Sequence, residues 1–186
     1  RDRVKAPLAL TAAFVPDSAS PANTKRASLT VCYFAGCMID RLYPEMGEAA
    51  INVLRACGVQ VTFPQQQGCC GLIALTSGDR GHCTTMAHQT IAMLEQALAE
   101  SKADYIVGAT TSCVVTLTQD YIRLFEDLKQ PEWLQRARAL SGKVMDFASF
   151  VDRVLLADGG VLPVRSGDAF PDKIVTYHDS CQSINC

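Results

Sequence analysis

Gln67-Gly68-Cys69-Cys70-Gly71 is the stretch around which the rest of the chain is best interpreted. Neighbouring side chains of an extended segment point to opposite faces, so two adjacent cysteines can meet one ligand only in a sharp loop. The flanking glycines permit such a loop, because glycine tolerates positive φ and lets the backbone approach a bound group closely. The alternative is a buried pair of small apolar side chains, since cysteine buries readily.

The composition is that of one domain with an excess of cysteine. The chain has 186 residues, of which 48% are hydrophobic and nine are cysteines, and its formal net charge is −2. This charge argues against nucleic acid as the main partner, and no apolar run approaches the length that spans a bilayer. A secreted disulfide scaffold is usually smaller, so the cysteines favour metal or redox chemistry in a reducing cytoplasm, with disulfides as the minor alternative.

The pattern of apolar residues predicts an α/β fold. Strands are predicted at residues 29–34, 59–63, 104–110 and 173–177. Helices are predicted over residues 44–57, 78–100 and 112–128, with shorter ones that begin at Pro131 and Asp146. Strands that alternate with helices indicate a parallel sheet of about four strands with helices on both faces, a Rossmann-like three-layer arrangement.

A cysteine follows each predicted strand. Cys37 follows the first strand, Cys69 and Cys70 follow the second, Cys113 follows the third and Cys181 follows the fourth. The carboxyl ends of parallel strands lie at one edge of a sheet, where binding sites form. We therefore expect four or five thiols that are distant in sequence to converge on this edge.

Convergent thiolates suit an iron–sulfur cluster or tetrahedral zinc. Zinc fingers normally use paired CxxC knuckles, which this chain lacks. An adjacent Cys-Cys pair suits a polynuclear cluster better, because each cysteine can bind a different iron. We favour a [4Fe–4S] cluster, with zinc as the alternative. Cys57 lies on an apolar helix stripe and Cys83 fits no ligand spacing, so both are expected in the core.

Six motifs occur in order: Gly36-Cys37, Phe63-Pro64-Gln65-Gln66-Gln67-Gly68-Cys69-Cys70-Gly71, Ser112-Cys113, Pro131-Glu132-Trp133, Asp146-Phe147-Ala148-Ser149-Phe150-Val151 and Tyr177-His178-Asp179-Ser180-Cys181. Over residues 29–186 they resemble the cysteine-rich CCG domain family. That family includes the cysteine-rich subunit of heterodisulfide reductase and the iron–sulfur subunits of glycolate oxidase and anaerobic glycerol-3-phosphate dehydrogenase. The resemblance is closest to its lactate-utilisation iron–sulfur proteins.

The resemblance implies an electron-transfer component, rather than the catalytic subunit, of a complex that oxidises L-lactate or a similar 2-hydroxy acid. It implies cluster ligation by Cys37, Cys69, Cys70 and Cys113, with Cys181 as a candidate extra contact. The groups expected to surround these sulfurs are Gly36, Gly68, Gly71, Thr111, Ser112 and His178. Ser112 is also the predicted N-cap of the helix that follows.

Family members usually carry two such repeats in tandem. Residues 29–172 are therefore expected to form the first CCG domain, and residues 173–186 the opening strand of a truncated second repeat. Residues 1–28 are expected to be a linker or the tail of a preceding domain. Because the chain starts at Arg1 without a signal-peptide pattern, we expect a piece of a longer polypeptide.

The expected partners are the second repeat, other subunits of the complex, and an electron-carrying protein or the quinone pool. The expected location is the cytoplasm, including a peripheral position on the inner face of the membrane.

Two other functions stay open. Heterodisulfide reductase performs thiol–disulfide chemistry at a cluster held by five cysteines, the last ligands forming CxxC. In this chain Thr110 stands at the first position of that pair, so a cubane held by four cysteines is expected instead. The other alternative is a structural zinc-binding interaction module without a redox role.

Overall fold

The computed structural model describes residues 29–157, Leu162, Thr176 and Cys181. The predicted linker at residues 1–28 and the predicted strand at 173–177, apart from Thr176, lie outside the described residues, as do His178 and Asp179.

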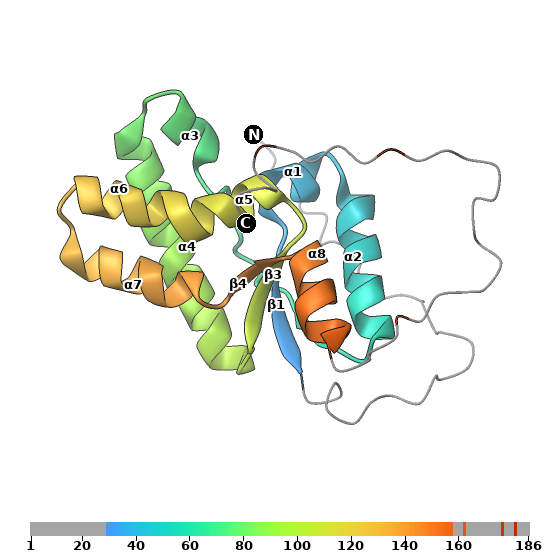
Figure 1. The fold of residues 1–186 in the computed structure, drawn as a ribbon. Helices are drawn as coiled ribbons and strands as arrows, with labels where there is room; N and C mark the ends of the chain where they lie inside the picture. The colour runs from blue at the N-terminus through green and yellow to red at the C-terminus, as the bar shows by residue number, and fades with distance from the viewer. Residues whose placement is uncertain (1–28, 158–161, 163–175, 177–180, 182–186) are drawn as a thin grey trace.

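A parallel sheet of four strands forms the centre of the fold (Figure 1). In spatial order the strands are β2 (Gln60–Thr62), β1 (Thr30–Phe34), β3 (Tyr105–Gly108) and β4 (Val144–Asp146). Residue pairs such as Val31 with Val61, and Cys32 with Ile106, set the register. The predicted α/β class with a parallel sheet is confirmed.

Strand β4 was not predicted, because its apolar part is only Val144 and Met145, between Lys143 and Asp146. Its last residue, Asp146, also caps the next helix, as predicted: the Asp146 carboxylate accepts a hydrogen bond of 3.0 Å from the Ser149 N–H. Because Asp146 is polar, the sequence gives no sign that it is also the last residue of a strand.

Helices connect the strands. They are α1 (Gly36–Arg41), α2 (Pro44–Ala56), α3 (Leu72–Thr76), α4 (Arg80–Ser101), α5 (Thr111–Val115), α6 (Tyr121–Asp127), α7 (Pro131–Ser141) and α8 (Phe147–Phe150). A π-helical turn, η1 (Thr116–Asp120), joins α5 to α6, and a second one, η2 (Val151–Leu155), follows α8. Helices α1 and α3 were not predicted, since one or two turns are too short to reveal a helical period.

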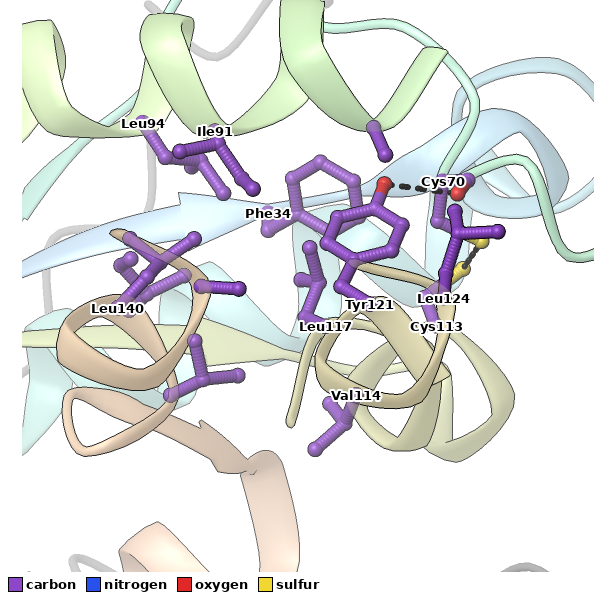
Figure 2. Packing of buried hydrophobic residues seen from close by; sticks show 14 of the residues in the cluster. Phe34, Cys70, Ile91, Leu94, Cys113, Val114, Leu117, Tyr121, Leu124 and Leu140 are labelled. Atoms are coloured by element: carbon purple, nitrogen blue, oxygen red, sulfur yellow. Dashed lines mark hydrogen bonds between the residues drawn. The ribbon is translucent and has the colours of Figure 1, made fainter. Parts of the chain in front are cut away.

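The helices cover both faces of the sheet, as predicted. Figure 1 shows α4, α6 and α7 on one side of the strands and α2 and α8 on the other. Alternate strand residues supply the two cores: Cys32 and Phe34 face the first group, whereas Val31 and Tyr33 face the second. Cys70 and Cys113 lie at the edge of the first core, beside Phe34 and Leu117 (Figure 2).

Candidate metal centre

Four cysteines meet at the carboxyl edge of the sheet. Cys37 lies in α1 directly after β1, Cys69 and Cys70 lie in the loop between β2 and α3, and Cys113 lies in the first turn of α5 after β3. The Sγ atoms of Cys37 and Cys69 are 3.4 Å apart, and those of Cys70 and Cys113 are 3.3 Å apart. Cys69 and Cys70 are adjacent in the chain, so the two pairs lie next to each other.

The two pairs differ in their surroundings. Cys70 and Cys113, the buried pair, are 2% and 4% exposed. Cys37 and Cys69, the partly exposed pair, border a cavity of about 160 Å³ that Phe63 and Gln67 also line. The site therefore has one side in the core and one side toward solvent.

Hydrogen bonds lower the pKa of the Cys70 thiol. The hydrogen bond between the sulfurs of Cys70 and Cys113 lowers the pKa of Cys70 to about 7 in spite of its burial. The Leu72 N–H and the Thr116 hydroxyl act in the same direction. The same contact raises the pKa of Cys113. Burial raises the pKa of Cys69 to about 11, although the Gly71 N–H lies 3.4 Å from its sulfur and opposes the rise.

The side chain of Gln67 fixes the cysteine loop to β1. Its amide nitrogen donates to the Tyr33 carbonyl at 2.7 Å, and its amide oxygen accepts from the Ala35 N–H at 2.8 Å. Backbone pairing between β1 and β2 ends with Cys32 opposite Thr62. The Gln67 amide thus takes the place of the next strand residue and satisfies backbone groups of β1 that would otherwise lose their partners.

Glycine is required at two positions next to the sulfurs. Gly36 has φ +66°, and a Cβ atom there would lie 3.0 Å from Cys113 Sγ. Gly71 has φ +85°, and a Cβ atom there would lie 3.4 Å from Cys83 Sγ. Both positions combine a left-handed backbone with a close approach, whereas Gly68 has no atom within 4 Å of such a Cβ.

The predicted N-cap at Ser112 is wrong. Thr110, with an extended backbone, occupies the N-cap position of α5, and both Thr111 and Ser112 lie inside the helix. Serine is a frequent N-cap, but the end of β3 places the cap two residues earlier. The hydroxyl that helps to lower the pKa of Cys70 belongs to Thr116 in η1. The sequence carries no signal for Thr116, because its partner Cys70 lies far away along the chain.

Two further cysteines of the described part of the chain lie in the hydrophobic cores. Cys57 and Cys83 are buried among apolar residues, as predicted. Cys181 is exposed, and His178 lies outside the described residues. Cys32, Cys37, Cys69, Cys70, Cys83 and Cys113 are not in disulfides.

The four thiols are donors that suit both an iron–sulfur cluster and a tetrahedral zinc site. Four thiolates about 2.3 Å from one zinc would all lie about 3.8 Å from one another. Within the described part of the chain, no group of three or more His, Cys, Asp or Glu side chains is arranged to hold a metal ion. The structure gathers the donors in two pairs of thiols with sulfur–sulfur distances of 3.4 Å and 3.3 Å. Cysteine thiolates are also the ligands of iron–sulfur clusters, where each binds its own iron.

A comparison with known protein families identifies the type of domain. Residues 31–118 match the model of the CCG cysteine-rich domain, and this part of the chain belongs to that family.

Among individual proteins, the chain is similar to lactate utilization protein A from three bacteria. The identity is 39% for Exiguobacterium sp., over 81% of this chain and 56% of that protein. It is 35% for Shouchella clausii and 32% for Geobacillus thermodenitrificans, each over 82% of this chain and 57% of the relative. The chain thus spans somewhat more than half the length of these relatives. No solved structure matches it.

None of the described helices combines the length and the apolar character that a membrane-spanning helix requires.

Proposed function

We propose that this protein binds a [4Fe–4S] cluster through Cys37, Cys69, Cys70 and Cys113 and serves as an electron-transfer component in the oxidation of lactate or another 2-hydroxy acid. The observation that carries the proposal is the meeting of these thiols from three separate strand ends, in two pairs with sulfur–sulfur distances of 3.4 Å and 3.3 Å. The substrate class is supported by the similarity to lactate utilization protein A.

The protein's contribution is to hold and prepare the thiolates. Cys70, with its pKa lowered to about 7, can give up its proton near neutral pH and bind metal as the thiolate. The N–H groups of Gly71 and Leu72 point to the sulfurs of Cys69 and Cys70 and stabilise negative charge there. The bound cluster would supply one-electron redox chemistry.

The partly exposed pair is the side of the site that faces solvent. Cys37 and Cys69 border the cavity, while Cys70 and Cys113 are enclosed by the core. Electron exchange with a partner would therefore take place on the side of Cys37 and Cys69. Exposed apolar side chains lie on α1 and the turn that follows it, next to Cys37: Met38, Leu42 and Tyr43.

The remaining length of the relatives suggests what these partners are. We place the first CCG domain at residues 29–172 and the start of a second repeat at residues 173–186. A complete second repeat, further subunits of the oxidising complex and an electron carrier or the quinone pool would then complete the path. The support for this part of the proposal is that the chain covers only 56% to 57% of the relatives' length.

Thiol–disulfide redox catalysis is the second candidate function. It is favoured by the Cys37–Cys69 pair, whose sulfurs lie 3.4 Å apart next to an open cavity. Thr110, where heterodisulfide reductase would have a cysteine, speaks against it. Turnover of a disulfide substrate by the anaerobically purified chain would favour this second function over electron transfer alone.

The decisive test is metal and sulfide analysis of the full chain purified without oxygen. We expect about four irons and four sulfides per chain, a brown colour, and an electron paramagnetic resonance (EPR) signal at low temperature after reduction. One zinc per chain without sulfide would contradict the proposal and support the structural zinc module.

A further inference from the structure

We propose that Cys37 and Cys69 form a reversible disulfide when the metal-free protein meets a small hydroperoxide, and that this bond preserves both side chains as ligands. Hydrogen peroxide is the simplest oxidant of this class. The part of the inference that concerns later metal binding rests on the proposed function, whereas the formation of the disulfide does not.

Both thiols are positioned from the same end of β1. Cys37 lies two residues after Ala35, and Cys69 lies two residues after Gln67. The Gln67 side-chain amide is bonded to the Ala35 N–H at 2.8 Å and to the Tyr33 carbonyl at 2.7 Å. The two sulfurs therefore meet at 3.4 Å, although they lie 32 positions apart in the chain.

Little movement is needed to close the bond. Cys37 and Cys69 are free thiols in the structure. The sulfurs of a disulfide are about 2.05 Å apart, so sulfurs at 3.4 Å have only a little more than 1 Å to approach. A Cβ atom at Gly68 would have no other atom within 4 Å, so the backbone next to Cys69 has room to adjust.

The reaction balances with hydrogen peroxide as the only other reactant. One thiol attacks the peroxide, so that a sulfur–oxygen bond forms, the oxygen–oxygen bond breaks, and water leaves a sulfenic acid behind. The second thiol attacks the sulfur of the sulfenic acid, the disulfide forms, and a second water leaves. The two thiols lose two electrons and two protons, and the peroxide takes up both to become two water molecules.

The neighbouring thiol stops the oxidation at a reversible stage. A sulfenic acid without a thiol partner is oxidised further to a sulfinic acid, which thiol reductants do not reverse. Because Cys37 and Cys69 are already in contact, their condensation is intramolecular and outcompetes attack by a second peroxide molecule. A thiol reductant then restores both free thiols by exchange.

Cys70 and Cys113 provide an internal control for proximity. Their sulfurs are 3.3 Å apart (Figure 2), but the two residues are only 2% and 4% exposed. Cys37 and Cys69 instead line a cavity of about 160 Å³, several times the roughly 30 Å³ of one water molecule. Hydrogen peroxide is only slightly larger than water and fits this cavity. Access, and not spacing, therefore selects the pair that reacts first.

The test uses the full chain, freed of metal with a chelator and a reductant and then desalted without oxygen. One equivalent of hydrogen peroxide is added, free thiols are alkylated at timed intervals, and tandem mass spectrometry distinguishes Cys69 from Cys70. We expect the Cys37–Cys69 disulfide to form at least about tenfold faster than the Cys70–Cys113 disulfide, which requires local opening. Equal rates for the two pairs, or sulfinic acid at Cys37 without a disulfide, would overturn the inference.

A variant tests whether Gln67 positions the pair. Gln67→Ala should slow formation of the Cys37–Cys69 disulfide about fivefold, because the loop is no longer tied to β1. Gln66→Ala changes an exposed residue of the same loop and should keep the wild-type rate. Equal rates in folded Gln67→Ala and in wild type would contradict the role of Gln67. If Gln67→Ala does not fold, the wild-type comparison of the two pairs still decides.

Metal binding separates this inference from the proposed function. Cadmium serves as the probe, because it binds thiolates with an ultraviolet absorption and requires no reductant. The oxidised chain should bind much less cadmium than the reduced chain until a phosphine reductant opens the disulfide. Equal binding by both forms would overturn the inference. Protein purified without oxygen that holds no iron and sulfide, yet forms the disulfide, would overturn the proposed function alone.

Discussion

The two thiol pairs have the same chemistry and almost the same spacing, yet they belong to different parts of the molecule. Cys70 and Cys113 are members of the hydrophobic core and pack with Phe34 and Leu117. Cys37 and Cys69 lie beside a cavity and contribute to neither of the two cores. The difference suggests a division of tasks: the buried pair ties the site to the fold, and the partly exposed pair connects it to the outside.

The largest expected effect is loss of the metal centre. Cys69→Ser and Cys70→Ser should each reduce the iron content to background, because each removes one thiolate ligand. Only Cys70→Ser should also lower the free energy of unfolding strongly, by about 1–3 kcal/mol, because it buries a hydroxyl in the core. Iron analysis and urea unfolding measure the two effects. Cys32→Ala removes a buried thiol outside the site and serves as the control, and full iron retention in both serine variants would contradict the ligand assignment.

The accessibility of the two pairs can be measured directly on the metal-free protein. We expect Cys37 to be alkylated at least about a hundredfold faster than Cys113, because Cys113 is reached only through local opening and its raised pKa keeps it protonated. Timed labelling with iodoacetamide followed by peptide mass spectrometry gives both rates. Equal rates for these two cysteines would mean that the distinction between the pairs does not hold in solution.

Gly36 lies between the two pairs, so a side chain there should disturb both. Gly36→Ala combines a positive φ with a Cβ atom 3.0 Å from Cys113 Sγ, and we expect a loss of about 3 kcal/mol in the free energy of unfolding. Gly68→Ala has room for the methyl group and should change the stability much less. Urea unfolding of both variants compares them, and similar losses would show that the close approach to Cys113 is not what requires glycine at position 36.

Gln67 should matter mainly for the partly exposed pair. Gln67→Ala removes two hydrogen bonds and leaves the buried N–H of Ala35 without its acceptor, which we expect to cost about 2 kcal/mol. Gln65→Ala, an exposed position in the same loop, is the matched control. The loop should also open, so Cys69 should react faster with iodoacetamide. An unchanged Cys69 rate would show that another contact holds the loop.

The main features of fold and site followed from the sequence because they depend on period and topology. Strands that alternate with helices form a parallel sheet, and such a sheet brings Cys37, Cys69 and Cys113 to one edge even though their separations in sequence are large. Neither inference needs the position of a side chain.

What the sequence could not reveal depends on side chains that meet only in the folded chain. The Gln67 side chain takes the place of a strand residue beside β1, and the Tyr121 hydroxyl, at the end of the π-turn, donates to the Cys70 carbonyl. A π-turn has no sequence period, and a glutamine in a loop looks like any solvated residue. Strand β4 has no pattern of its own, because polar residues follow and precede its two apolar ones, Val144 and Met145.

The cavity next to Cys37 and Cys69 has a practical consequence for work in air. Its volume of about 160 Å³ is several times the roughly 30 Å³ that one water molecule occupies. Dioxygen and peroxide can therefore enter it, whereas the core shields Cys70 and Cys113. Oxidative damage should begin at one flank of the site, and the first lesions after aerobic purification should be found on Cys37 and Cys69.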